Sequence, residues 1–297
     1  MSDTVEILHN RIEKAATLGS VVRTMKTLAA LNIRQYEEAV RALDDYYHTV
    51  ELGLAACLRQ LGGGRITIGN HDMKPNLTIA VVFGSDQGLV GKFNDQLAET
   101  VMTWRHSLET GTSIIAIGER IQSRLQDARL PPESLFSVPN SVNAITPLVG
   151  DLLSAVEHMR ERAQKIELYL FYNSPQSGEF YRPVSKRLLP LDESWEEQIR
   201  HNVGRWPTKA IPEILCGLDT AEWALMREFL FVSMFRACAE SLAAENASRL
   251  SAMQRAGKNI DEMMEELTRL YHERRQAKID EELFDVVSGF QALGGDK

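Results

Sequence analysis

The sequence predicts an α/β protein in which long helices at the two chain ends flank a central domain of alternating strands and helices. Two observations predict the helices: both end segments lack proline, and apolar or small residues recur in them alternately three and four positions apart. A third observation predicts the central domain. Short apolar runs rich in β-branched residues alternate there with amphipathic segments, which is typical of parallel βαβ units.

The N-terminal segment, residues 1–62, is expected to form one helix. Its apolar repeat runs from Leu18 to Val50 at an average spacing of about 3.5 residues, which is the seam of a coiled coil. Ser2 or Asp3 can cap the start of this helix. The run of glycines that begins at Gly62 is expected to end it.

The C-terminal segment, residues 212–297, is expected to form the second long helix. The repeat returns between Asn246 and Arg274, and no proline follows Pro212. A helix that starts later, capped by Asp219 or Thr220, is an alternative. Because each helix carries one apolar stripe, the simplest arrangement pairs the two helices, and a compact domain between them favours antiparallel pairing.

The central segment, residues 75–192, is expected to hold the α/β domain. The predicted strands are LTIAVVF (77–83), SIIAIG (113–118) and IELYLFY (166–172), with helical segments between them. Residues 182–191 are expected to add a strand at the edge of the sheet, where proline is tolerated.

Composition excludes several classes of protein. The net charge of −8 gives no general affinity for nucleic acid. Cys57, Cys216 and Cys238 have no metal-site spacing and are expected to be reduced thiols, so we expect neither a metal nor another cofactor. No apolar run is long enough to span a membrane. The N-terminus resembles neither a signal peptide nor a transit peptide.

The stretch FGSDQGLVGKF, residues 83–93, resembles a phosphate-binding loop at first sight. A P-loop requires glycine five positions before its Gly-Lys pair and a hydroxyl side chain after it, but this chain has Asp86 and Phe93 there. A carboxylate repels phosphate. The sequence therefore favours an ordinary strand-to-helix turn, and a nucleotide-binding enzyme is kept as an alternative function.

The end of the second long helix carries more apolar surface than one partner helix covers. Its apolar residues shift to a wider face from Ile279 onward. One interpretation is a terminal helix that packs back on the domain, and the other is a tip that enters a sleeve in another protein. The charged stretch 273–282 just before it is either a solvated face or a set of contacts to partner loops.

Three blocks of sequence resemble a known family. They are TMKTLAA (24–30), FGSDQGLVGKFN (83–94), and the C-terminal pair ESLAAENASRLSAMQRAGKN (240–259) and LTRLYHERRQAKIDEELFDVVSGFQAL (267–293). In this order they resemble the gamma subunit of F-type ATP synthases. The chain departs from the family at Gln87, where the family has arginine, and at Val90, where it has cysteine. These departures indicate a divergent member.

The resemblance implies an antiparallel coiled coil of the end helices plus a central Rossmann-like domain. It implies a rotating central stalk that couples ion flow through a membrane ring to ATP synthesis or hydrolysis on beta subunits. The chain itself would have no catalytic activity and no cofactor. It would be peripheral on the cytoplasmic side of the bacterial inner membrane. A coiled-coil adaptor unrelated to ATP synthases stays an alternative.

The resemblance also implies the partners of the chain, and nucleic acid is not expected among them. They are the ring of six alpha and beta subunits, the epsilon subunit and the c-ring. The residues expected to contact the ring of six are Met25, Lys26, Arg275, Gln276, Ile279, Leu283 and Val287. The residues expected to contact epsilon or the c-ring are Ser85, Asp86, Gln87 and Gly88.

Overall fold

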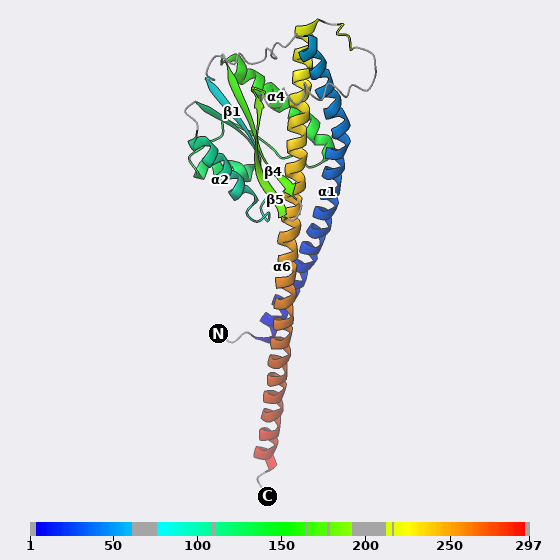
Figure 1. Ribbon diagram of the computed structural model, residues 1–297. Coiled ribbons are helices and arrows are strands. Elements are labelled where there is room, and N and C mark those ends of the chain that lie inside the picture. The colour runs from blue at the N-terminus through cyan, green and yellow to red at the C-terminus, as the bar shows by residue number, and fades with distance from the viewer. Residues whose placement is uncertain are drawn as a thin grey trace. The chain divides into compact units, whose positions relative to one another are not determined.

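The computed structural model describes residues 4–60, 76–107, 111–163, 165–176, 179–191, 212–215 and 217–294. The predicted fold class is confirmed: long helices lie at both chain ends, and a mainly parallel sheet with shorter helices lies between them in the sequence (Figure 1). The chain divides into two compact units. The first unit is Met1–Ala29 with Leu250–Lys297, and the second unit is Ala30–Arg249.

The long helices are α1, Val5–Gln60, and α6, Leu218–Gly294. Thr4 lies at the start of α1 and accepts a hydrogen bond from the Ile7 N–H at 3.4 Å. The α6 helix follows Gly217, which has a φ of 82°. It therefore begins just before Asp219, close to the later of the two predicted starts. The predicted caps Ser2 and Asp3, the predicted stop at Gly62, and Cys216 lie outside the described residues.

Within the first unit the two helices run antiparallel. The rings of His9 and Tyr271 have centroids 6.0 Å apart. Further along α1, Val22 lies opposite Gly257, where an added Cβ would be 3.8 Å from a Val22 methyl group. As the residue number rises along α1, the number of the contacting residue on α6 falls. The two helices are therefore antiparallel in this unit.

The second unit shows the same direction of pairing and carries the sheet. The Asn32 side chain donates to Asn246 at 3.3 Å, and Asp44 accepts from Arg236 at 3.1 Å. The sheet has the order β3-β2-β1-β4-β5, with parallel neighbours except β5, which is antiparallel to β4 at an edge. The strands are β1 Leu77–Phe83, β2 Thr112–Ile117, β3 Ser134–Phe136, β4 Ile166–Gln176 and β5 Glu179–Leu189. The helices are α2 Phe93–His106, α3 Glu119–Asp127, a short 3-10 helix Val142–Ala144 and α4 Ile145–Glu161.

Strand alternation divides the core of the second unit into two layers. In β1, Ile79 and Val81 face a core shared with α4 and with the α1 and α6 segments of this unit, whereas Ala80 and Val82 face α2 and α3. Successive side chains of a strand point to opposite faces, so a continuous apolar run such as LTIAVVF indicates a strand covered on both sides. Both faces of the sheet are therefore buried, and the carboxyl end of β1 opens into the glycine turn.

We expect Gly118→Ala to lower the free energy of unfolding by about 3 kcal/mol. Gly118 has a φ of 113°, and an added Cβ would lie 2.6 Å from the Ser85 carbonyl oxygen. Gly150→Ala is the matched control because an added Cβ there meets nothing within 4 Å. In helix α4 that change should raise stability by about 1 kcal/mol. Urea unfolding of the full chain measures both, and equal effects would contradict the strain at Gly118.

Candidate functional site

The glycine turn between β1 and α2, residues 84–92, is stabilised internally by hydrogen bonds of Ser85. Ser85 is fully buried. Its hydroxyl donates to the Gln87 carbonyl at 3.0 Å and accepts from the Asn94 amide at 2.8 Å. The Asn94 side-chain oxygen in turn accepts from the Ser85 N–H at 3.1 Å. The predicted partner contact at Ser85 is therefore replaced by an internal role, because a fully buried side chain has no surface to offer.

The Asp86 carboxylate accepts two hydrogen bonds from backbone N–H groups outside the glycine turn. One carboxylate oxygen accepts from the Glu119 N–H at 3.0 Å, and the other accepts from the Val138 N–H at 2.9 Å. Glu119 is the first residue of α3, so the carboxylate caps the positive end of that helix. Backbone amides that could bind a phosphate are thus used by the protein's own side chain. Asp86 has an internal role, like Ser85.

The exposed residues of the turn are Gln87, Leu89, Gly91 and Lys92. Gln87 is exposed, Gly88 is half-buried, and Leu89 is 60% exposed. Leu89 adopts a φ of 63°, which is uncommon for a residue other than glycine. The sequence did not indicate Leu89, because a positive φ outside glycine has no reliable sequence signal. The turn presents an apolar side chain beside a neutral amide.

The turn is also docked on α6 within the second unit. The Ser241 hydroxyl donates to the Phe83 carbonyl at 2.9 Å, and the Ser248 hydroxyl donates to the Val90 carbonyl. Ala244 lies between these serines in the sequence of α6 and packs against Val90 in a small buried cluster. Both ends of the turn are therefore attached to one helix. Sequence reasoning missed these serines, since hydroxyls in a long helix are usually solvated.

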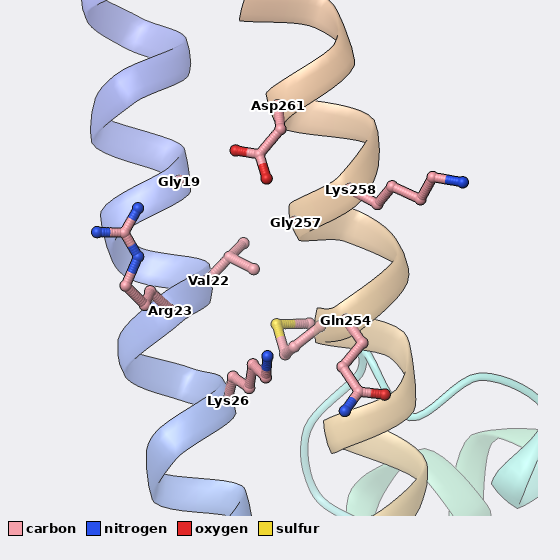
Figure 2. Close-up of a pocket in the computed structure, with 9 residues that line it drawn as sticks. Gly19, Val22, Arg23, Lys26, Gln254, Gly257, Lys258 and Asp261 are labelled. Carbon is pink, nitrogen blue, oxygen red and sulfur yellow. The ribbon is translucent and has the colours of Figure 1, made fainter.

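The predicted contact residues Met25 and Lys26 lie on α1 in the first unit. Met25 is half-buried and Lys26 is exposed. Lys26 lines a depression of about 310 Å³ between α1 and α6, and both Gly19 and Gly257 line it as well. In Figure 2 the Lys26 and Asp261 side chains extend toward the space between the helices. The missing glycine side chains account for the depression, which places the Lys26 ammonium group at an accessible surface.

The C-terminal tip, here residues 275–289, is exposed along its described length. Arg275 and Gln276 are exposed, and the apolar side chains that follow are exposed too. Their exposed fractions are 47% for Ile279, 58% for Leu283, 75% for Phe284, 70% for Val286 and 48% for Val287. An apolar surface of this kind on a helix usually marks an interaction site. The predicted ring contacts Arg275, Gln276, Ile279, Leu283 and Val287 thus lie together on one exposed helical segment.

Comparison with known proteins identifies the family. A family model described as ATP synthase matches residues 4–293. Relatives named ATP synthase gamma chain include one from Granulibacter bethesdensis, 26% identical over 98% of this chain and 99% of the relative. The chain belongs to the ATP synthase gamma family. A further gamma chain, from Brevibacillus brevis, is 25% identical over 98% of this chain and 99% of its own length.

Solved structures of similar fold come from ATP synthases. A chain of the Euglena gracilis mitochondrial ATP synthase (OSCP/F1/c-ring) aligns with a TM-score of 0.62 at 16% identity, covering 97% of this chain and 94% of its own. A central-stalk/c-ring chain from the Tetrahymena thermophila mitochondrial enzyme aligns with a TM-score of 0.58 at 20% identity, covering 80% and 99%. Gamma-family members are subunits of a membrane-associated complex. None of the helices in the part of this gamma-family chain that the structure describes is apolar enough over a sufficient length to cross a bilayer.

We expect Asp86→Ala to lower the free energy of unfolding by about 2 kcal/mol, because two backbone N–H groups lose their acceptor. Asp86→Asn is the matched control, since its single side-chain carbonyl can still accept one of the two hydrogen bonds. It should cost about half as much. Urea unfolding measures both variants. An alanine variant as stable as the parent chain would contradict the internal role of Asp86.

Proposed function

We propose that this gamma-family chain is the rotating central stalk of an F1Fo-type ATP synthase, coupling ion flow through a membrane ring to ATP synthesis or hydrolysis on beta subunits. The observation that carries the proposal is the exposed apolar tip of α6. Membership of the gamma family over residues 4–293 supports it. An adaptor unrelated to ATP synthases accounts for the helices but not for this family match.

The tip suits a bearing within the ring of alpha and beta subunits. Apolar contacts are non-directional and depend mainly on the area that is buried. A helix with Leu283, Phe284 and Val287 on its surface can therefore turn in an apolar sleeve without breaking fixed hydrogen bonds. Ile279 extends the same surface toward the charged segment.

The exposed polar residues of the first unit suit contacts that are made and broken. We propose that Lys26, Arg275 and Gln276, with Met25 beside Lys26, meet loops of the beta subunits. All three polar side chains are exposed. Exposed ion pairs stabilise by only about 0–1 kcal/mol, whereas buried ones carry a large desolvation cost when they are broken. Exposed pairs therefore suit an interface that is rearranged at each rotational step.

The chain is proposed to be non-catalytic and to need no cofactor. Support comes from the glycine turn, where Asp86 already occupies the Glu119 and Val138 amides. The proposed location is the cytoplasmic side of the bacterial inner membrane, held there by partner subunits. The bacterial relatives support that location.

We propose a separate role for each segment of the chain. Residues 1–62 and 212–297 form the shaft, and residues 75–192 form the domain that meets other rotor subunits. Gln87 and Gly88 are proposed to contact the epsilon subunit or the c-ring, with Leu89 as an added apolar contact. Both Gln87 and Leu89 are exposed.

We expect the full chain to co-purify with coexpressed alpha and beta subunits and to have no ATPase activity by itself. Leu283→Asp with Phe284→Asp should reduce recovery of the complex at least tenfold, because the tip would bring charge into an apolar sleeve. Both side chains are exposed, so the free chain should unfold as the parent does. Asp285→Asn on the same helix is the control. A stable ATPase without partners, or full recovery of the doubly substituted complex, would overturn the proposal.

Two exposed glutamines allow a matched test of the partners. We expect a photo-crosslinking residue at Gln276 to capture the beta subunit, and one at Gln87 to capture epsilon or the c-ring. Both side chains are exposed, so the label should not disturb the core. Mass spectrometry of the purified complex identifies the products. A beta-subunit product from Gln87 would contradict the assignment of the turn.

A further inference from the structure

Three hydroxyl groups join the sheet of the second unit to α6. Ser241 donates to the Phe83 carbonyl at 2.9 Å, and Ser248 donates to the Val90 carbonyl. The third bond runs the other way, from the Ser174 hydroxyl on β4 to the Glu240 carboxylate at 2.8 Å. These bonds are additional to the apolar core that α6 shares with the sheet.

All three bonds reach the same edge of the sheet. Phe83 is the last residue of β1, and Ser174 lies near the end of the neighbouring parallel strand β4. Val90 belongs to the turn that leaves β1. On the helix side, the bonds come from adjacent positions 240 and 241 and from position 248, seven residues on. Within the second unit, α6 is therefore bonded to the carboxyl edge of the sheet at separate points along the helix axis.

The two attachments made by Ser241 and Ser248 are sheltered from water. Ser241 is 3% exposed and Ser248 is 6% exposed. The Glu240 carboxylate is also fixed by Arg236, which donates at 2.8 Å and reaches Asp44 of α1 at 3.1 Å. Hydrogen bonds weaken steeply when donor and acceptor are misaligned. A rotation of the sheet relative to α6 would therefore be resisted at these points.

The α1 helix meets the same sheet by different contacts. Tyr36, Val50 and Leu54 join the apolar core, and the Lys186 ammonium lies 5.8 Å from the centre of the Tyr47 ring. Apolar and cation–π contacts have broad geometric tolerance compared with hydrogen bonds to backbone carbonyls. Together with the electrostatic attraction between Glu51 of α1 and Lys186, these contacts are less directional than the hydrogen bonds between α6 and the sheet.

We propose that α6 is the helix through which the α/β domain passes torque to the shaft, with Ser174, Ser241 and Ser248 as the positioning residues of that joint. The inference rests on the proposed function, because torque enters only if the domain is driven by another rotor subunit. The three serines act by holding the sheet at a fixed angle to α6.

The test uses the complete complex reconstituted in vesicles. The joint variant carries Ser174→Ala, Ser241→Ala and Ser248→Ala. The control carries Tyr46→Phe, Ser123→Ala and Ser154→Ala, which also removes three hydroxyls; Tyr46 bonds to Glu228 of α6, and the two serines bond within their own helices. ATP hydrolysis and ATP-driven ion pumping are measured together against an increasing opposing gradient. The result is expressed as ions pumped per ATP and normalised to assembled complex.

We expect the joint variant to hydrolyse ATP at the parental rate while its ions pumped per ATP fall at least twofold under load. The control should stay within about a tenth of the parent. Ser248→Thr alone, which keeps the hydroxyl, should pump like the parent, and Ser248→Ala alone should show part of the loss. A joint variant whose pumping ratio matches the control would overturn the inference.

Measuring whether the chain enters the complex distinguishes a failure of the torque inference from a failure of the proposed function. If the parental chain does not enter the complex or support pumping, the proposed function is wrong. If it does and the joint variant pumps normally, only the torque joint is wrong. Should the triple variant fail to assemble, Ser174→Ala alone decides, because Ser174 is only half-buried. An unchanged pumping ratio in that variant would also count against the joint.

Discussion

The fold of the second unit depends on one packing constraint: a fully parallel core sheet must be covered on both faces. Helices α2 and α3 cover one face, and α4 covers part of the other. The rest of that face is covered by the α1 and α6 segments of this unit, so the long helices are part of the domain's core. Met234 and Ala239 of α6 are fully buried there. Without these helices, apolar side chains of β1 and β4 would face water.

Several polar groups inside this core are satisfied by polar partners. Glu245 is 5% exposed, and burial raises the pKa of its carboxyl group despite the opposite effect of Arg249. Arg249 donates to Glu245 at 2.6 Å. Asn246, the next residue, donates to the Leu242 carbonyl and accepts from Asn32. Buried polar pairs of this kind add little net stability but are costly to leave half-made. Of these bonds, the one between Asn32 and Asn246 joins α1 to α6 and restricts how the two helices can be aligned.

Much of the fold could be predicted because its signals are local. The alternation of three and four between Leu18 and Val50 predicts α1, and runs such as LTIAVVF predict the buried strands. The short strand β3, Ser134–Phe136, was not predicted, because three residues give no periodicity to detect. Phe93 and Asp86 argue against a phosphate loop on chemical grounds. The hydrogen bonds that Asp86 makes could not be predicted from the sequence, because the Glu119 and Val138 amides come from distant parts of the chain.

The candidate contact residues also divide into those that the sequence could predict and those that it could not. Exposure of Ile279, Leu283 and Val287 follows from a helix that carries more apolar residues than one stripe requires. Burial of Ser85, and the roles of Ser241 and Ser248, depend on how the turn packs against α6. Tertiary contacts decide such positions, and no spacing rule in one sequence encodes them. The sequence therefore predicts the ends of the shaft better than it predicts the joint with the domain.

The exposed tip has a consequence for how such a subunit is made. A newly synthesised copy carries Phe284 and Val286 in water until a partner covers them. Exposed apolar surface promotes self-association and recognition by chaperones. Free copies in excess of their partners would therefore aggregate or be degraded. The apolar tip, which we propose turns against partner subunits, would also tie production of this chain to the supply of its partners.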